Sequence, residues 1–405
     1  MTSGPRSLLS SIPHAPLLDR GKMAAMSVAP SPSTPASRAA APRIVLADRG
    51  DALVSHLSRA MHERFRVVAQ IDTEITQAER LLVAATTFRP GRREWVERFY
   101  KSNLAVSMRS RRAARALDDV DAPFDVVFQT HALFELTDPR SVLYIDCTHR
   151  QSADQWPEWN PLRGAGLERW YVRERRQYHS AAHLFAFSVE TRDSLVEQYH
   201  VPADRVTVVG AGLNFDVMPE VDLERRRVAA PTVLFIGNDF ERKGGLQLLR
   251  AFRFVREQVP TARLVVVGTP HPIPPQDGVE VIGRVEGRSA MSRLYEEASV
   301  FCLPSFFDPF PLVLMEAMAH RLPCVATSTC GVLEIVLDGE TGVMVPRDDA
   351  MVTSIAATLT ELLLDPARAA HLGDAGRQRV EERFLWSHVI DRMTPILAAM
   401  TPQRR

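Results

Sequence analysis

The chain has 405 residues, of which 45% are hydrophobic and 24% charged, and its 49 basic side chains equal its 49 acidic ones. This length favours two domains over one ordinary core. The balanced charge gives no global field for nucleic acid, so we expect no nucleic-acid partner. The four cysteines form no CxxC pair and fit a reducing cytoplasm. No apolar run reaches the roughly 20 residues that span a bilayer, which favours a soluble or peripheral protein.

The first segment, residues 1–42, is rich in Ser, Pro and Ala and shows little periodicity. Such a segment buries too little surface to offset the entropy of ordering it, so we expect a disordered extension. Two alternatives stay open. The segment is punctuated by basic residues and could be a targeting signal, although it lacks a continuous apolar core, or translation could start at Met23 or Met26.

From Arg43 onward, short apolar runs alternate with stretches of helical spacing. Strands are predicted, in chain order, at 43–48, 66–72, 125–130, 142–147, 183–188 and 205–212, and helices at 51–65, 167–180 and 191–200. This alternation predicts a mostly parallel sheet in an N-terminal domain over residues 43–213. The periodicity lapses over residues 214–230, where we predict the interdomain linker.

The alternation restarts after Pro231 and predicts a second domain over residues 231–380. Strands are predicted at 232–237, 262–268, 279–283, 300–305 and 324–327, and helices at 245–258, 289–298, 311–322, 331–337, 352–364 and 368–384. The predicted fold class is therefore α/β, with two Rossmann-like doubly wound domains. Because such sheets bind ligands at the carboxyl ends of their strands, we expect an interdomain site.

The segment GNDFERKGG, residues 237–245, leaves a predicted strand and enters a predicted helix. Its cations Arg242 and Lys243 stand just before the helix, where free N–H groups and partial positive charge stabilise a diphosphate. The glycine spacing matches neither the P-loop nor the dinucleotide pattern, which argues against NTP hydrolysis and NAD binding. A solvated turn is the structural alternative.

The segment SFFDPFPLVLMEAMA, residues 305–319, again leads from a strand into a helix. Its two prolines suit the first turn of a helix, so Asp308 is predicted at the N-cap, accepting a backbone N–H. Glu316 lies further inside the helix among apolar neighbours, where it has no capping role. Its carboxylate could accept both hydroxyls of a ribose, and a partly exposed helix glutamate is the alternative.

Three segments in this order, FIGNDFERKGGLQLLRAF, CLPSFFDPFPLVLMEAMAHRLPCVAT and GVLEIVLDGETGVMVP, resemble the retaining GT-B glycosyltransferases of group 1. These enzymes carry an E-x7-E signature, which here reads D-x7-E. The resemblance covers about residues 180–390. It implies a GT-B fold and retaining sugar transfer to a glycan, lipid or small-molecule hydroxyl, as in polysaccharide biosynthesis. The donor is a nucleotide diphosphate sugar, with neither metal nor cofactor. It also implies that residues 381–405 cross back to the N-terminal domain as a helix.

Carried over position by position, the resemblance implies that Lys243 contacts the donor diphosphate and Glu316 the ribose hydroxyls. Asp308 stands where the family has its first Glu, which touches the donor sugar. Gly283 and Arg284 resemble the turn that contacts the base. The remaining donor-site positions that it implies are Gly237, Asn238, Arg242, Phe310 and the backbone N–H groups of Leu312 and Val313.

Three positions depart from the family pattern. Asn238 stands where the family has an Arg on the phosphates, which leaves Arg242 as a substitute. Pro311 replaces a Gly and removes one backbone donor, and Asp308 is one methylene shorter than Glu. These departures motivate an alternative function, a catalytically weak or inactive nucleotide-sugar-binding protein. An epimerase of similar two-lobed fold is a third reading, for which we place no acid–base pair.

The N-terminal domain resembles the family only loosely. Gly50 is the single glycine at the first βα turn, where the family has a glycine-rich loop. Family members place a donor-contacting His after a strand, and both His131 and His149 follow predicted strands; we prefer His131. The tryptophans that could stack on an acceptor sugar, or be buried instead, are Trp156, Trp159 and Trp170.

An arginine run lies on an alanine-rich stretch of this domain and comprises Arg109, Arg111, Arg112 and Arg115. Two readings stay open, a basic helix on an anionic lipid surface and a solvated charged face, and we favour the second. The protein is therefore expected in the cytoplasm, either free or at the inner membrane surface.

Overall fold

A computed structural model of the chain describes residues 41–48, 52–160, 162–228 and 230–401. The extension predicted for residues 1–42, apart from its last two residues, lies outside the described residues, and so does Gly50. The chain divides into two compact units. Unit 1 comprises the chain up to Ala186, residues 192–209 and the chain from Ile390, and unit 2 comprises residues 187–191 and 210–389.

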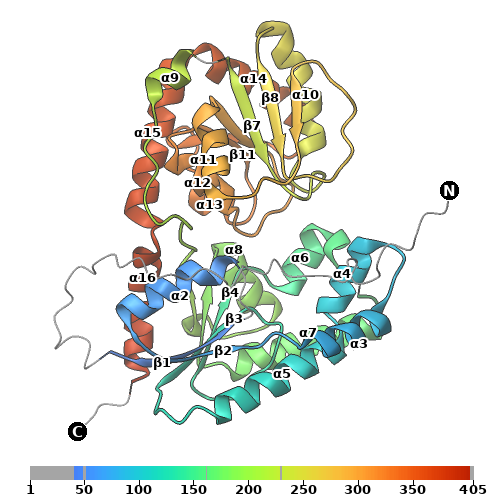
Figure 1. Cartoon of the computed structure of the whole chain (residues 1–405), viewed down its shortest axis with the longest axis vertical. Coiled ribbons are helices and arrows are strands. Elements are labelled where there is room, and N and C mark those ends of the chain that lie inside the picture. Colours follow the sequence, from blue (N-terminus) through green and yellow to red (C-terminus); the bar gives the residue numbers. More distant parts are fainter. Residues whose placement is uncertain (1–40, 49–51, 161, 229, 402–405) are drawn as a thin grey trace. The chain divides into compact units, whose positions relative to one another are not determined.

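Unit 1 is built on a six-stranded parallel sheet with the order β2-β1-β3-β4-β5-β6 (Figure 1). Its strands are β1 (Arg43–Asp48), β2 (Arg66–Asp72), β3 (Val126–Thr130), β4 (Ser141–Ile145), β5 (His183–Ala186) and β6 (Val206–Val208). Every residue of β3, β4 and β5 is buried. This is the behaviour expected of inner strands in a parallel sheet that helices cover on both faces.

Three helices of unit 1, those that begin at Gln77, Asn103 and His149, each follow a side chain that caps them. Thr76 accepts the N–H of Glu79, whose carboxylate in turn accepts the N–H of Thr76, and Ser102 accepts the N–H of Ala105. The helices are α2 (Ala52–Arg64), α3 (Gln77–Thr87), α4 (Arg92–Tyr100), α5 (Asn103–Asp118), α6 (His149–Gln155), α7 (Ala165–Ser180), the short turns Pro157–Trp159 and Ala203–Arg205, and the π-helical turn Ser194–Gln198. The helix α8 (Val189–Asp193) begins in unit 2 and ends in unit 1.

Unit 2 is built on a second six-stranded parallel sheet, with the order β12-β11-β10-β7-β8-β9. Its strands are β7 (Thr232–Ile236), β8 (Arg263–Val267), β9 (Val279–Ile282), β10 (Val300–Leu303), β11 (Cys324–Thr327) and β12 (Gly342–Val345). The strands β7 and β10 lie at the centre of the sheet and are buried throughout. Their carboxyl ends therefore lie side by side at one edge of the sheet.

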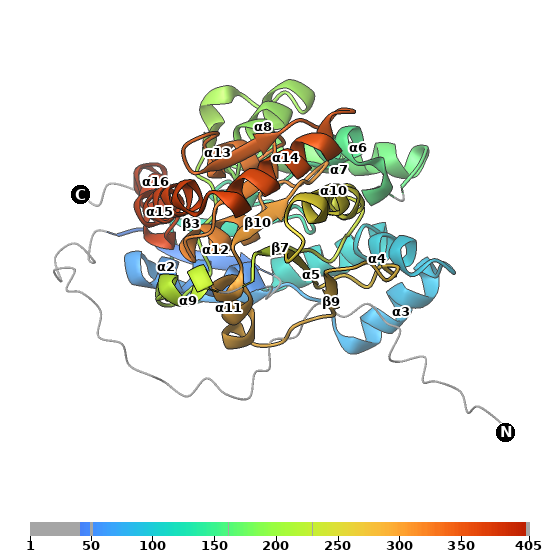
Figure 2. The same ribbon diagram turned by 90° about the horizontal axis from the view of Figure 1, so that it is seen from above.

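Helices cover both faces of the second sheet. Figure 2 shows α10 (Gly245–Gln258) and α14 (Met351–Leu364) packed together on one face, and α11 (Arg288–Glu297) and α12 (Leu312–Ala319) on the other. The remaining helices are α9 (Leu223–Val228), α13 (Val332–Ile335), α15 (Pro366–Arg383) and α16 (Trp386–Ala399). The boundary between the units at Val389 falls inside α16.

The predicted α/β fold class is confirmed, with two parallel sheets of six strands each. Strand and helix positions agree to within a few residues, and α10 occupies the predicted residues 245–258. The strand β12 and the helices α3, α4, α6 and α9 were not predicted, and α9 lies within the segment predicted as the linker. The segment predicted as one helix at 191–200 is α8 followed by a π-helical turn.

Candidate functional site

The loop after β7 holds Lys243 at the start of α10. The helix begins at Gly245, with Gly244 as its N-cap. Gly244 has a φ of 74°, and a Cβ at this position would lie 1.9 Å from the carbonyl oxygen of Pro304, so only glycine fits here. Lys243 therefore lies both at the carboxyl end of a central strand and at the N-terminus of a 14-residue helix. This is the location that the sequence predicted.

Gly237, which directly follows β7, makes room for the stem of Lys243. A Cβ at Gly237 would lie 2.5 Å from Cδ of Lys243 and 3.3 Å from the ring of Phe235. The contact distance of 2.5 Å is far below van der Waals contact. The lysine stem can cross the end of the strand only because position 237 has no side chain.

The ammonium group of Lys243 pairs with Asp308. Nζ of Lys243 lies 3.0 Å from Oδ2 of Asp308, and both side chains are largely buried. The predicted N-cap role of Asp308 is wrong, because α12 begins at Leu312 with Pro311 as its N-cap residue. The carboxylate binds the neighbouring cation instead. Any anion that binds Lys243 must compete with this carboxylate for the ammonium group.

The N-terminus of α12 offers backbone donors beside this ion pair. Pro311 makes no side-chain capping bond. Leu312 and Val313 are the first residues of the helix, so their N–H groups have no acceptor inside it. Together with the partial positive charge of the helix start, these groups favour an anion. The predicted contact of the Leu312 and Val313 N–H groups with a diphosphate depends on their place at the start of α12.

Glu316 is held from the neighbouring helix α11. Its Oε2 accepts a hydrogen bond of 2.8 Å from the hydroxyl of Tyr295, which is fully buried. Burial raises the pKa of Glu316, while the Tyr295 hydroxyl and the charges of Arg288 and Lys243 act in the opposite direction. Glu316 is therefore a partly exposed helix glutamate, as the alternative reading expected, but its carboxylate is also held by the Tyr295 hydroxyl.

Sequence reasoning missed Tyr295, although its hydroxyl was a usable signal. A tyrosine on the apolar side of a predicted helix needs a polar partner when it is buried. Its ring also stacks on His320, with centroids 4.8 Å apart. Burial lowers the pKa of His320 to about 4, and its ring nitrogens lie 2.7 Å from Oγ of Ser292 and 2.7 Å from the carbonyl oxygen of Glu316. A neutral histidine thus contacts both members of the Tyr295–Glu316 pair.

Arg242 joins the two loops of the site from inside the protein. It is only 5% exposed, its Nε lies 3.3 Å from Oδ2 of Asp239, and it donates to the carbonyl of Phe307. Its own carbonyl accepts the N–H of Phe306 at 2.9 Å. A role on the diphosphate, which stays a prediction, would require the guanidinium to leave these partners. Asn238, by contrast, is exposed at the surface of the loop.

The other predicted donor-site positions also lie in unit 2. Gly283 and Arg284 are exposed in the turn that follows β9, and a Cβ at Gly283 would meet nothing within 4 Å. Phe310 is buried, with its ring 5.8 Å from that of Phe187 and 6.4 Å from that of Phe384. The turn after β9 is therefore open to solvent, whereas the ring of Phe310 packs the loop before α12.

In unit 1, His131 directly follows β3 at the carboxyl edge of the sheet. It has a φ of 61°, a left-handed conformation that is rare for residues other than glycine. Its N–H donates to the carbonyl of Tyr144, and its Nδ1 lies 3.8 Å from Oδ1 of Asp146 after the neighbouring strand. Residues in this conformation cluster at functional sites, although His200, Arg321 and Cys330 share it, and the donor contact of His131 stays a prediction.

His149 is an interior residue of unit 1. It is 4% exposed and is the first residue of α6, with Thr148 as the N-cap. Its ring packs 5.4 Å from that of Trp170, which is also buried. Burial, together with the charges of Lys101 and Arg173, lowers the pKa of His149 to about 2. This helix position and burial do not favour the reading of His149 as a donor contact, and Trp170 takes the buried role.

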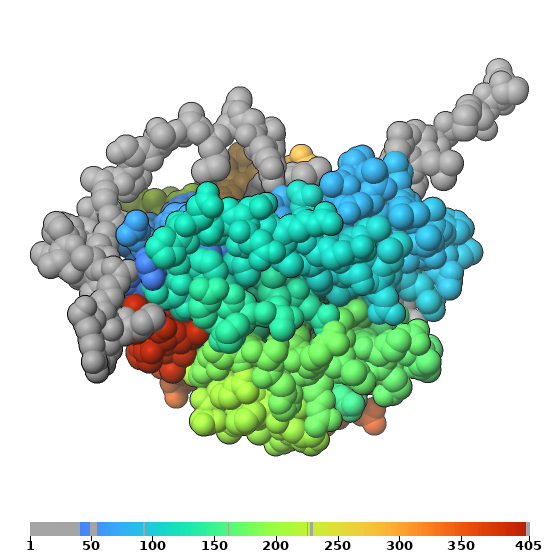
Figure 3. Space-filling view, turned by 90° about the horizontal axis from the view of Figure 1, so that it is seen from below, coloured from blue at the N-terminus to red at the C-terminus, as the bar shows by residue number. Residues whose placement is uncertain are grey.

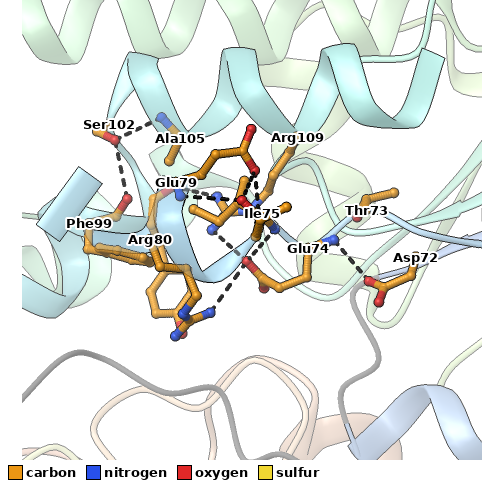
Figure 4. A network of polar contacts seen from close by, with 12 residues as sticks. Asp72, Thr73, Glu74, Ile75, Glu79, Arg80, Phe99, Ser102, Ala105 and Arg109 are labelled. Atoms are coloured by element: carbon orange, nitrogen blue, oxygen red, sulfur yellow. Dashed lines mark hydrogen bonds and ion pairs between the residues drawn. The ribbon is translucent and has the colours of Figure 1, made fainter. Parts of the chain in front are cut away.

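Arg109 also belongs to the interior and not to a basic surface. Its side chain is fully buried, its Nη2 lies 3.4 Å from Oε1 of Glu74, and it donates to the carbonyl of Tyr100 (Figure 4). Arg80 lies 3.6 Å from the same carboxylate oxygen. The prediction that Arg109 shares a solvated or lipid-facing surface with its neighbours is therefore wrong, because this residue binds an acid after β2.

The other three arginines of the run are exposed on α5, which crosses the face of unit 1 in Figure 3. Arg111, Arg112 and Arg115 line a cavity of about 730 Å³ whose wall also includes acidic side chains. Those acids are Asp72, Glu79 and Asp119. Because acids alternate with the arginines, the surface is a solvated face of mixed charge.

The described residues lack two further features. None of their helices is both long and apolar enough to cross a membrane. Within the same part of the chain, no group of three His, Cys, Asp or Glu side chains is arranged to hold a metal ion. The four cysteines are free thiols, and three of them are buried.

Residues 230–365 match the family model described as Glycosyl transferases group 1. The donor-site residues predicted in unit 2 lie within this match, and His131 lies outside it. It supports the family resemblance that the three motifs carry. The chain is 30% identical over 259 residues to an alpha-maltose-1-phosphate synthase of Mycolicibacterium smegmatis, and this match covers 55% of this chain and 64% of that protein. It is 32% identical over 240 residues to a D-inositol 3-phosphate glycosyltransferase of Thermobispora bispora, covering 53% and 55%.

Solved structures share the fold of the chain. A sucrose-phosphate synthase of Thermosynechococcus elongatus superposes with a TM-score of 0.66 at 19% identity, covering 88% of this chain and 99% of that chain. The Anabaena protein HepE, solved in complex with UDP-glucose, gives 0.62 at 14% identity, covering 88% and 100%. The fold is thus that of the GT-B glycosyltransferases. The chain spans between about half and two thirds of the length of the two curated relatives.

Proposed function

We propose that this chain is a glycosyltransferase that moves a sugar from a nucleoside diphosphate sugar to an acceptor hydroxyl, with retention of anomeric configuration. The observation that carries the proposal is the grouping of Lys243, the α12 N-terminus and the supported Glu316 in unit 2. An ammonium group and free N–H groups suit a diphosphate, and a carboxylate suits ribose hydroxyls. The group 1 match over residues 230–365 supports the same assignment.

The chemistry needs little from the protein beyond position and charge. As the bond from the anomeric carbon to the diphosphate oxygen breaks, negative charge grows on the diphosphate, where Lys243 and the N–H groups of Leu312 and Val313 would stabilise it. The acceptor oxygen attacks the anomeric carbon from the face on which the diphosphate leaves. Its proton passes to the departing oxygen, so no side-chain nucleophile is required.

In unit 2 the donor sugar would be contacted by Asp308, and in unit 1 the candidate for a donor contact is His131. Asp308 is positioned by its ion pair with Lys243, at 3.0 Å. His131 projects from the carboxyl edge of the first sheet in a strained backbone conformation. The acceptor is a glycan, a lipid-linked sugar or a small molecule, and the transfer belongs to polysaccharide or glycoconjugate synthesis.

The test is a transfer assay with the full chain, a panel of nucleotide sugars and cell extract as the source of acceptors. We expect nucleotide release with one donor, reduced roughly 100- to 1000-fold in Lys243→Met. NMR of the product should show the anomeric configuration of the donor. An inverted product would overturn the retaining assignment, and release that is unchanged in both Lys243→Met and Glu316→Gln would overturn the site.

A second candidate function is nucleotide-sugar binding without turnover, and the cation pattern favours it. Lys243 is paired with Asp308, and Arg242 is engaged inside the protein, so the site lacks the exposed second cation that the family has at position 238. Thermal shift with nucleoside diphosphates separates the two functions. Stabilisation without turnover, in both the natural chain and Asp308→Glu, supports binding alone, whereas turnover in either supports the transferase.

A further inference from the structure

The linker segment carries an arginine that binds the ends of two helices. Arg226 lies in α9, and Figure 2 shows α9 beside α11 and α12. Its Nε donates to the carbonyl of Glu296 at 3.1 Å, and its Nη2 donates to the carbonyls of Tyr295 at 3.1 Å and His320 at 2.9 Å. A fourth bond, of 3.2 Å, runs from Nη1 to the carbonyl of Arg321.

Three of these carbonyls, those of Tyr295, Glu296 and His320, are groups that a helix leaves unpaired at its C-terminus, and Arg321 directly follows the C-cap of α12. Tyr295 and Glu296 stand in the last turn of α11, and His320 is the C-cap of α12. Such carbonyls carry partial negative charge and need donors. A guanidinium group suits them because its donors are fixed in one plane. Burial lowers the pKa of Arg226 to about 10, so the group remains charged at neutral pH.

The same two helices carry the hydrogen-bonded pair of the candidate site. Tyr295 belongs to α11 and Glu316 to α12, and their 2.8 Å bond depends on the position of one helix against the other. Arg226 binds both helices through rigid donors at their shared end. A slide of either helix would break at least one of the bonds to Arg226 and would also lengthen the Tyr295–Glu316 bond.

We propose that Arg226 is a positioning residue, which fixes α11 against α12 so that Glu316 presents its carboxylate to the ribose of the donor. This inference rests on the proposed function, since it assumes that Glu316 binds ribose. Under this proposal the linker does more than connect the two units. Through Arg226, which binds the C-terminal end of α12, it also sets the geometry of the nucleotide site.

The experiment separates positioning from general stability by its choice of ligand. Binding of UDP, GDP and ADP to the full chain is measured by calorimetry, each beside its 2′-deoxy form. Loss of the 2′-hydroxyl should weaken binding to the natural chain by roughly tenfold or more, the usual value of a hydrogen bond to a charged group. In Arg226→Met we expect weaker binding of the ribonucleotide. The 2′-deoxy form should then bind less than about threefold more weakly than the ribonucleotide.

The matched control is Arg256→Met. Arg256 also lies in unit 2 and donates to a backbone carbonyl, that of Ala262 at 3.0 Å, but it touches neither α11 nor α12. The Arg256→Met variant should prefer the ribonucleotide over its 2′-deoxy form as strongly as the natural chain does. If Arg226→Met does not fold, Arg226→Lys serves instead, because an ammonium group keeps the charge but cannot bridge four carbonyls, and it should also lower this preference.

The possible results separate the ribose role of Glu316 from the positioning role of Arg226. A natural chain that binds ribose and deoxyribose forms equally overturns the ribose role of Glu316, and the positioning role with it. A natural chain that discriminates, together with a folded Arg226 variant that discriminates as well, overturns the positioning role alone. A reduced preference for the ribonucleotide in Arg226→Met, with an unchanged preference in Arg256→Met, supports the proposal.

Discussion

Gly237→Ala is the smallest change that should impair the candidate diphosphate site. The new Cβ would lie 2.5 Å from Cδ of Lys243, so the lysine stem must move away from the end of β7. The φ of Gly237 lies outside the left-handed range, so alanine itself adds no backbone strain. The binding free energy should fall by the value of one charge-assisted hydrogen bond, about 1.5–3 kcal/mol. The dissociation constant of the nucleoside diphosphate should therefore rise roughly 10- to 150-fold.

Calorimetry with the preferred nucleoside diphosphate measures this effect, and a double-mutant cycle assigns it. If glycine acts only by seating Lys243, Gly237→Ala should add almost nothing in a Lys243→Met background, since the interaction is already lost. Circular dichroism and thermal unfolding should show that the single variant stays folded. Unchanged affinity in Gly237→Ala, or a full additive loss in the double variant, would refute the steric role.

Three further changes test the surroundings of the site. Tyr295→Phe removes the only hydrogen bond to the side-chain carboxylate of Glu316 that the described residues show, and should weaken nucleoside diphosphate binding roughly tenfold in calorimetry; unchanged binding contradicts the support role. Asp308→Asn frees the ammonium of Lys243, so nucleoside diphosphate should bind more tightly, by up to roughly tenfold, while sugar transfer falls; weaker binding argues against competition for the cation. The pKa of His320 is lowered from 6.5 to about 4, so its contribution to stability is complete above pH 6.5 and is lost as the pH falls towards 4, by about 3 kcal/mol. Urea unfolding at pH 7 and pH 4.5 measures this effect. Between the two pH values, the free energy of unfolding of His320→Gln should fall less than that of the natural chain, and an equal fall would show that His320 is not responsible.

The positions of Lys243 and Glu316 in the fold follow from local sequence, and their roles at a donor site stay predictions. Lys243 is placed by a strand end and a helix start that lie within a few residues of it, so its location needs no knowledge of distant contacts. The same holds for Glu316, whose position inside α12 follows from the apolar residues around it. Both sheets were predicted because buried parallel strands read as continuous apolar runs.

The errors arose where a distant partner overrides a local rule. Asp308 looks like a helix cap next to two prolines, but the chain stays extended through Pro311 and the carboxylate pairs with a cation 65 residues away. Arg109 looks exposed within an arginine run, but it binds Glu74, 35 residues earlier. Periodicity shows that a helix has a buried face, whereas the packing of other elements decides which polar residues that face contains.

The pairing of Tyr295 with Glu316 was beyond sequence reasoning for a related reason. The bond joins two helices that are separated by a strand and a loop, and their relative position depends on contacts at the opposite end, including those of Arg226. A pattern within either helix contains no information on that distance. The burial of His149 depends in the same way on Trp170, which belongs to a different helix.

The central claim is that unit 2 binds a nucleoside diphosphate through Lys243 and Glu316. Calorimetric titration of the full chain with UDP, GDP and ADP tests it most directly, with Lys243→Met and Glu316→Gln measured in parallel. The account predicts that one of the three nucleotides binds and that each substitution weakens this binding at least tenfold. Failure of all three to bind, or binding that neither substitution changes, would contradict it.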